Sequence, residues 1–244
     1  MRDGAALEPT GRIGDRLPPY PTSRLRNVWH DHGLSIVLIV LFLLTFVGQV
    51  GAGWLDYNED QRAHGERAVG LAQYLTTGHF GEATFENWES EFLQMAFFVL
   101  LTVFLYQKGS SESKRPDAIE LVDLDPRESP NKDSAPWPVR RGGLVLRLYE
   151  NSLSLSFAML FVASFALHVV TGAAEFNQEQ LAHQQHTVTR MQYLGSPRFW
   201  FESFQNWQSE FLSLAGMVIL TIMLRQRGSP ESKPVDASMW ETGR

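Results

Sequence analysis

Two glutamates, Glu91 and Glu210, have the type and setting that could do chemistry. They lie 119 positions apart, each inside an Asn-Trp-x-Ser-Glu-Phe-Leu segment that leads into an apolar run. A carboxyl close to hydrocarbon must find a partner, water or a proton, because an isolated charge is costly there. Two such carboxyls could share a proton, or could bind a hard cation through their oxygens.

Each glutamate shares one helix face with two other polar residues, at spacings i, i+4 and i+7. Two more polar residues lie at a similar depth on the preceding apolar runs. The polar intramembrane cluster that we expect is therefore Asn87, Glu91, Gln94, Asn206, Glu210, Ser213, Gln49 and His168. Trp88 and Trp207 are expected to anchor the same helices at the membrane interface.

A structural interpretation of the same cluster stays open beside the functional one. Thr84 and Ser203 are suited to cap the two helices, and the carboxylates would then lie near a positive helix N-terminus. The polar residues would in that case tie helix ends together rather than hold an ion.

Other chemistry finds little support. The chain has no Cys, which excludes thiolate metal sites, Cys nucleophiles and disulfides. His183 and His186 have the spacing of half a metal site, but the position matching His186 in the first half of the chain is Arg67. Facing His pairs for a haem are absent, because only His168 lies in an apolar run. We therefore expect no catalytic residue, no metal and no cofactor.

Four apolar runs must position these residues: 34–52, 92–107, 153–171 and 211–224. The first run has 19 uncharged residues and, at about 1.5 Å per residue, reaches roughly the 30 Å of a bilayer core. A soluble bundle would place polar residues on the outward face of each helix, and these runs offer almost none. The pattern predicts an all-α integral membrane protein with four transmembrane helices.

An internal repeat relates the two halves. Residues 34–118 align without a gap with residues 153–237, and six of seven positions match between 87–93 and 206–212. Each half holds two predicted spans, which makes the repeats tandem and parallel. The expected organisation is a flexible cytoplasmic arm (1–33), repeat 1 (34–118), a flexible cytoplasmic linker (119–147), repeat 2 (148–237) and a tail (238–244).

Charge gives the orientation and excludes one class of partner. The net charge is -6, which argues against nucleic-acid binding. Of the 21 Lys and Arg residues, 17 lie in 1–33, 108–152 and 225–244, outside the two loops between paired spans. By the positive-inside rule, both termini and the central linker are expected in the cytoplasm.

The Phe-Glu-Asn-Trp-Glu-Ser-Glu-Phe-Leu-Gln stretch (85–94), the Leu-Thr-Val-Phe-Leu that ends the second run, and the repeated Gly-Ser-x-Glu-Ser-Lys carry a resemblance. From about Trp29 to Ala237, the chain resembles an uncharacterised family of bacterial transmembrane proteins that is known only as a domain of unknown function. The resemblance implies a small multi-pass protein of the bacterial inner membrane. It implies no activity, cofactor or catalytic residue.

The function that these observations favour is a non-enzymatic accessory or structural component of the cell envelope. The alternative is a small cation- or proton-coupled transporter or channel subunit that uses Glu91 and Glu210. The expected partners are the lipid bilayer and either further copies of the chain or other membrane proteins, because four helices are few for a pore.

Overall fold

A computed structural model describes residues 24–128 and 134–243 of the chain. These residues form helices and turns without strands, which confirms the all-helical class. The α-helices are α1 (Arg24–Ala63), α2 (Leu71–Tyr74), α3 (Gly78–Phe104), α4 (Trp137–Arg141), α5 (Gly143–Glu150), α6 (Ser152–Ala182), α7 (Arg190–Leu194) and α8 (Pro197–Met223). Most of the predicted arm, residues 1–23, lies outside the described part, as do residues 129–133 of the linker.

The predicted linker contains short helical elements in its described part. Two 3-10 turns, η2 (Leu121–Asp123) and η3 (Pro126–Glu128), are followed by α4 and by the start of α5. Gly142 separates the two helices and Gly143 begins α5, with φ angles of 70° and 63°, a backbone conformation that glycine adopts without strain.

The chain divides into two compact units, Met1–Ala52 and Gly53–Arg244. The described part of the first unit is a single helical segment, the N-terminal portion of α1. The second unit contains the end of α1 and all the other helices, and it holds every residue of the site described below.

Of the helices in residues 24–128 and 134–243, two are long and apolar enough to cross a membrane, over Val28–Ala63 and Ser152–Ala182. They contain the first and third predicted spans, and they support a membrane location. Only 17% of the most apolar window of α6 is buried, whereas the core helix of a soluble protein would be mostly buried. The second and fourth predicted spans lie in α3 and α8, although α3 ends at Phe104, three residues before the predicted end.

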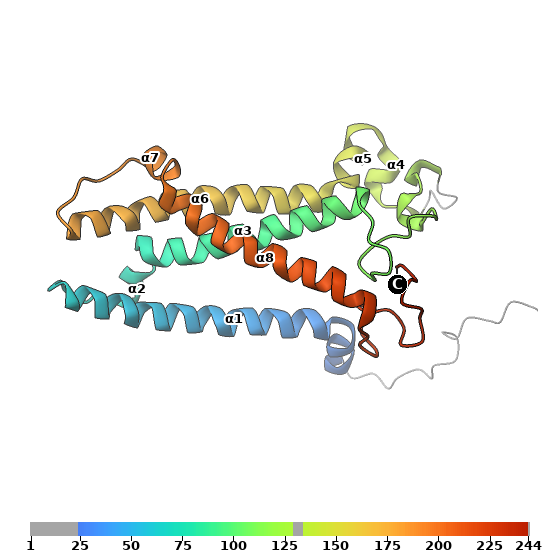
Figure 1. Ribbon diagram of the computed structural model, residues 1–244, viewed down its shortest axis with the longest axis horizontal. Coiled ribbons are helices and arrows are strands. Elements are labelled where there is room, and N and C mark those ends of the chain that lie inside the picture. The colour runs from blue at the N-terminus through green and yellow to red at the C-terminus, as the bar shows by residue number, and fades with distance from the viewer. Residues whose placement is uncertain (1–23, 129–133, 244) are drawn as a thin grey trace, which may run out of the picture. The chain divides into compact units, whose positions relative to one another are not determined.

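In the second unit, α3 packs along α6 and also against α8 (Figure 1). Small residues allow the approach of α3 to α6. A Cβ on Gly78 would lie closer than 3 Å to backbone atoms of Glu175 and Thr171, and one on Gly81 would meet the Thr171 side chain equally closely. The backbones of the two helices are therefore in direct contact, which membrane helices commonly achieve through small residues.

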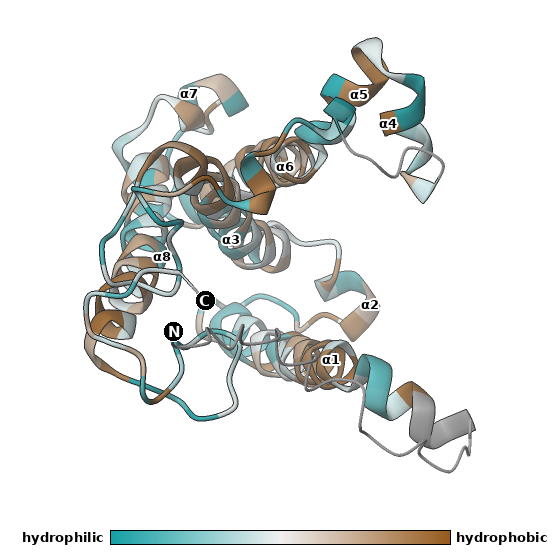
Figure 2. Ribbon diagram, turned by 90° about the vertical axis from the view of Figure 1, so that its right-hand side faces the viewer, coloured by the Kyte–Doolittle hydropathy of each residue, from teal (hydrophilic) through white to brown (hydrophobic). Residues whose placement is uncertain are grey.

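The outward faces of the three helices are apolar. Figure 2 shows hydrophobic residues along α3, α6 and α8. Large side chains on these faces are more than 45% exposed, and they include Val103, Phe104, Met159, Val162, Leu212 and Ile219. A surface of this kind is suited to lipid contact rather than to water.

Helices α3 and α8 begin earlier than the sequence suggested. Their N-caps are Thr77 and Ser196, whose hydroxyls accept hydrogen bonds from Phe80 N and Phe199 N. The expectation that Thr84 and Ser203 are the caps was wrong, since each helix starts about two turns earlier. Both residues are instead buried inside their helices.

The two Gly-Ser-x-Glu-Ser-Lys segments form the same turn after α3 and after α8. Gly109 and Gly228 have positive φ angles of 89° and 84°. Ser113 Oγ accepts from Gln107 N at 2.8 Å, and Ser232 Oγ accepts from Gln226 N at 2.9 Å. The motif therefore encodes a local turn, in which glycine supplies the backbone conformation and serine satisfies a backbone donor.

Candidate functional site

The best-formed polar site of the described residues is centred on His168 in α6. The His168 side chain is fully buried, and its Nδ1 lies 2.8 Å from Glu89 Oε2 of α3, which is also fully buried. The other oxygen of Glu89 accepts a hydrogen bond from Trp207 Nε1 of α8 at 2.9 Å. A carboxylate is an acceptor only, so the Nδ1 proton points to Glu89 and the ring orientation is fixed.

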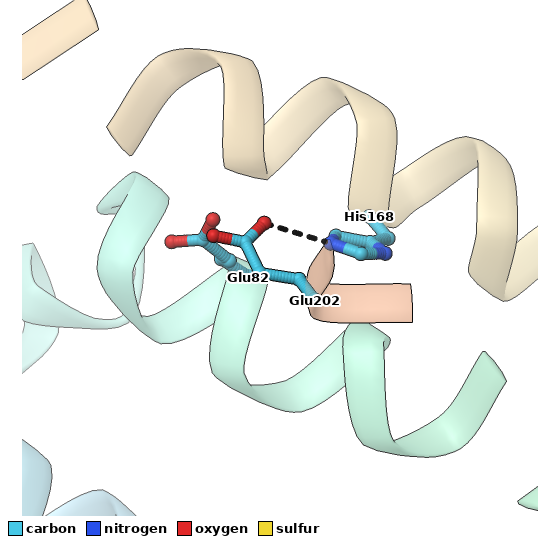
Figure 3. Close-up of side chains that lie close together, drawn as sticks. All are labelled: Glu82, His168 and Glu202. Atoms are coloured by element: carbon cyan, nitrogen blue, oxygen red, sulfur yellow. Dashed lines mark ion pairs between the residues drawn. The ribbon is translucent and has the colours of Figure 1, made fainter. Parts of the chain in front are cut away.

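The second ring nitrogen of His168 faces two carboxyl groups. Its Nε2 lies 3.9 Å from Glu202 Oε2 and, although buried, has no hydrogen-bond partner among the residues that the structure describes. Three helices contribute to this group: α3 provides Glu82, α6 provides His168 and α8 provides Glu202 (Figure 3). Each side chain offers one ligand atom, and the three atoms all lie within 4.8 Å of one another. These three side chains are the group that could hold a metal ion.

Tyr193 of α7 contacts both carboxyl groups of this three-residue group. Its buried hydroxyl donates to Glu202 Oε2 at 2.7 Å and lies 3.1 Å from Glu82 Oε1. Burial and the neighbouring carboxylates of Glu82 and Glu202 raise the pKa of the Tyr193 phenol, so it keeps its proton. One phenol proton cannot serve two carboxylates fully, which leaves negative charge between Glu82 and Glu202.

Four carboxyl groups gather around these side chains, on Glu82, Glu86, Glu89 and Glu202; with His168 and Tyr193 they form what we call the His168 cluster. Glu86 accepts a hydrogen bond from the Asn206 amide. Within the described residues, ion pairs to the cluster come from His168 and from Arg198 alone, and Arg198 divides its contacts between Glu202 and Glu179. With all groups ionised, negative charge exceeds positive charge by two in a poorly solvated place.

A cavity of about 500 Å³, which we call the acidic cavity, is lined by residues from the C-terminal ends of α1 and α6. Its lining includes five acidic side chains: Asp56, Asp60, Glu66, Glu175 and Glu179. Glu175 Oε2 is buried and has no hydrogen-bond partner in the described part of the chain. His64 and His183, which are also part of the lining, face each other with ring centroids 6.5 Å apart. Through Arg198, which contacts both Glu179 and Glu202, this cavity adjoins the His168 cluster.

The structure brings together some of the predicted site residues. Gln94 Nε2 donates to Ser213 Oγ at 2.9 Å and to the carbonyl oxygen of Glu210 at 2.8 Å, which links α3 to α8. Of the other predicted residues, His168 and Asn206 lie in or against the His168 cluster. Trp207, expected to be an interfacial anchor, donates its indole N–H to Glu89.

Other predicted residues are not members of this cluster. Glu91 is exposed, and Asn87 is exposed and bonds the carbonyl oxygen of Ala83 in its own helix. Trp88 packs edge-on against Phe85. Gln49 belongs to the first unit of the chain.

The sequence-based interpretation did not select Glu82, Glu86, Glu89, Glu202 or Tyr193 as site residues. A signal was available, because the first three of these glutamates follow the spacing i, i+4 and i+7 and therefore share one face of α3. The four glutamates differ from their counterparts in the other half, so identity between the halves did not point to them, whereas Tyr193 matches Tyr74. Glu82 matches Phe201 and Glu202 matches Ala83 in the repeat alignment, so the cluster is asymmetric.

Comparison with known families gives one match. The family described as a domain of unknown function (DUF6766) matches the chain over residues 25–244. No curated protein and no solved structure matches the chain.

Proposed function

The chain belongs to this family of unknown function, as its motifs had indicated, and from that premise we propose a role that rests on its own residues. The protein is a small membrane protein that binds a cation, a proton or a metal ion, at the His168 cluster and passes it through the membrane. The cluster takes the part that the sequence suggested for Glu91 and Glu210.

The proposal includes the arrangement in the membrane. Helices α1, α3, α6 and α8 each cross the bilayer once. They form two tandem parallel repeats of two spans, and both termini and the central linker lie in the cytoplasm of a bacterial cell. The apolar outward faces of α3 and α8 support this, as does the distribution of Lys and Arg. Since four helices are few for a pore, further copies of the chain are the expected partners.

The observation that carries the function is the excess of buried negative charge. Four carboxyls with two cationic partners cannot all stay ionised in a low-dielectric place, because each uncompensated charge there is costly. Protons or a bound cation must supply the missing positive charge. Ionisable groups inside a membrane protein commonly mark an ion or proton pathway for this reason.

The acidic cavity supplies an entry for the cation. Five acidic side chains in one concave surface attract and concentrate cations from solution. Glu175 and Glu179 line this cavity, and Arg198 connects Glu179 to Glu202. Arg198 is thus the ion-pairing residue that lies between a cation held in the cavity and the cluster.

We propose no enzymatic activity, since the cluster contains no activated nucleophile. A structural role in the envelope is the second candidate, and one observation favours it. Glu86 and Glu89 are each bonded by donors from another helix, so the cluster also fastens α3 to α6 and α8.

Flux through liposomes tests the proposal. The purified full chain is reconstituted, and uptake of protons and of a panel of mono- and divalent cations is followed with entrapped dyes. We expect flux in the wild type and its loss in Glu82→Gln and Glu202→Gln, which keep the shape of each side chain but remove its charge.

Glu91→Gln with Glu210→Gln is the matched control, and we expect it to keep the flux. Flux that disappears in this control but survives in the cluster variants would move the function back to Glu91 and Glu210. A wild type that carries no tested ion, together with cluster variants of lowered thermal stability, would favour the structural role.

A further inference from the structure

The three-residue group at the centre of the His168 cluster has the chemistry of a metal site. We propose that Glu82, His168 and Glu202 bind one divalent transition-metal ion, with Zn²⁺ as the best-suited ion. This inference rests on the proposed function, because it names the cation that the same cluster holds.

The two ring nitrogens of His168 are arranged as in metal-binding histidines, in which one nitrogen donates a hydrogen bond to a carboxylate and the other binds the metal. Nδ1 is committed to Glu89 at 2.8 Å, and Glu89 is in turn held by Trp207. Histidines that ligate metals almost always donate their other N–H to a carboxylate or carbonyl in this manner, which fixes the tautomer and makes the ligand nitrogen more basic. Nε2 is then the free lone pair, and it is the atom that faces the two carboxyls.

The contact between Nε2 and Glu202 is unfavourable without a cation. At 3.9 Å the two atoms are too far apart for a hydrogen bond. When the ring is neutral, its Nε2 lone pair is repelled by the carboxylate oxygen, and a proton on Nε2 or a metal ion between the two atoms removes this repulsion. The separation is shorter than a Zn–N and a Zn–O bond placed end to end, about 4.0 to 4.3 Å, so one ion can bond to both atoms. Among the described residues, Nε2 is also buried without a hydrogen-bond partner, whereas buried polar atoms are usually hydrogen-bonded.

The third ligand and the charge fit the same ion. Glu82 adds a carboxylate oxygen within 4.8 Å of both other ligand atoms, from a different helix. A site of one imidazole and two carboxylates suits Zn²⁺, Fe²⁺ or Mn²⁺, whereas Mg²⁺ and Ca²⁺ prefer oxygen ligands alone. Because His168 must be neutral to bind a metal, the four carboxylates then keep only Arg198 as a cationic partner, and a divalent ion supplies two of the three missing positive charges.

Tyr193 belongs to the surroundings of the metal rather than to its ligands. Its hydroxyl reaches Glu202 Oε2 at 2.7 Å and Glu82 Oε1 at 3.1 Å. A donor in this position orients ligand carboxylates, and the fourth position of the metal is left for water or for a passing group.

Cobalt binding to the metal-stripped full chain in detergent tests the site. Co²⁺ replaces Zn²⁺ in such sites and gives a visible absorption band when nitrogen and oxygen ligands surround it at low coordination number. We expect one Co²⁺ per chain, displaced by Zn²⁺. The variant His168→Asn keeps an N–H donor for Glu89 but lacks Nε2, and we expect it to bind at least about 10-fold more weakly, the lower bound for losing even an outer partner.

Glu91→Gln is the matched control, because it removes a carboxyl from an exposed position of the same helix, outside the His168 cluster. We expect Glu91→Gln to keep the Co²⁺ band and Glu82→Gln and Glu202→Gln to lose it. Equal weakening in all three variants would reduce the site to diffuse attraction by acidic groups and overturn the proposal. Binding that survives His168→Asn would also overturn it, by placing the ion elsewhere.

Failure of the metal site and failure of the proposed function give different results. A folded wild type that binds neither Co²⁺ nor Zn²⁺, yet carries protons into metal-free liposomes through Glu82 and Glu202, would overturn the metal site and leave the function standing. Absence of both binding and flux would overturn both.

Discussion

His168 shows at the scale of a single residue how one side chain joins structure and function. Its Nδ1 is tied to Glu89, which makes the ring part of the packing between α3 and α6. Its Nε2 faces Glu202 without a hydrogen bond, and this atom is the one available for chemistry. The contact between Nδ1 and Glu89 therefore fixes the orientation of the ring and with it the position of Nε2.

The Trp207–Glu89 hydrogen bond predicts a loss of stability on removal of the indole donor. Trp207→Phe keeps an aromatic ring but leaves one oxygen of a fully buried carboxylate unpaired, at a cost of about 1–3 kcal/mol. Thermal unfolding in detergent measures the effect. Trp200→Phe, which changes a more exposed ring on the same helix, is the control, and an equal loss there would show that only ring packing matters.

Among the helices, the contact between α3 and α6 decides the geometry of the site. Glycines in α3 bring the backbones together, and this proximity places Glu89 next to His168. A bulkier residue at the contact would separate the helices and with them the two ligand-bearing faces.

Alanine at Gly78 is expected to destabilise the fold by about 1–3 kcal/mol, because its Cβ would press on the backbone of α6. Gly216→Ala in α8 is the contrasting variant, since nothing lies within 4 Å of the added Cβ. There the higher helix propensity of alanine should stabilise by about 0.5–1 kcal/mol. Opposite shifts of the melting temperature are expected, and a tolerated Gly78→Ala would disprove the close contact.

The turn after α8 gives a second prediction at the scale of elements. Lys233 is 1% exposed, and its Nζ donates to the carbonyl oxygens of Ser238, Met239 and Glu241. Lys233→Met removes all three bonds, so we expect residues 234–243 to lose protection in hydrogen–deuterium exchange. Lys114→Met, at the matching position of the other half, removes an exposed ion pair with Asp123 and should change exchange much less.

At the scale of the whole molecule, the number of spans determines on which side each loop lies. Two helices meet the requirements of length and hydropathy, whereas the proposed arrangement needs α3 and α8 to cross as well. If only α1 and α6 crossed, the segment between α3 and α6 would lie on the outer side.

Single cysteines distinguish these arrangements, because the chain has none of its own. With four spans, Gln185→Cys is expected to react with a membrane-impermeant thiol reagent in intact cells. Glu128→Cys and Asp236→Cys should react only after permeabilisation. All three positions are exposed, so a lack of reaction reports the membrane side. Labelling of Glu128→Cys but not of Asp236→Cys from outside would leave only two crossings, whereas labelling of both would reverse the orientation.

The local features of this protein could be predicted from its sequence. Helical content follows from the length and hydropathy of the apolar runs, and the Gly-Ser-x-Glu-Ser-Lys turns follow from residues next to one another in the chain. Short-range hydrogen bonds and backbone preferences decide such features, so these features depend only on residues that are close together in the sequence. The family membership followed from the same motifs.

The tertiary structure alone decided which polar residues meet. Identity between the two halves drew attention to Glu91 and Glu210, but the cluster forms from Glu82, Glu89, His168 and Glu202, which have no identical counterparts in the other half. Their meeting depends on how far α3, α6 and α8 are shifted and rotated against one another. Packing between helices sets these quantities, through contacts such as Gly78 on Glu175 that join residues far apart in the chain.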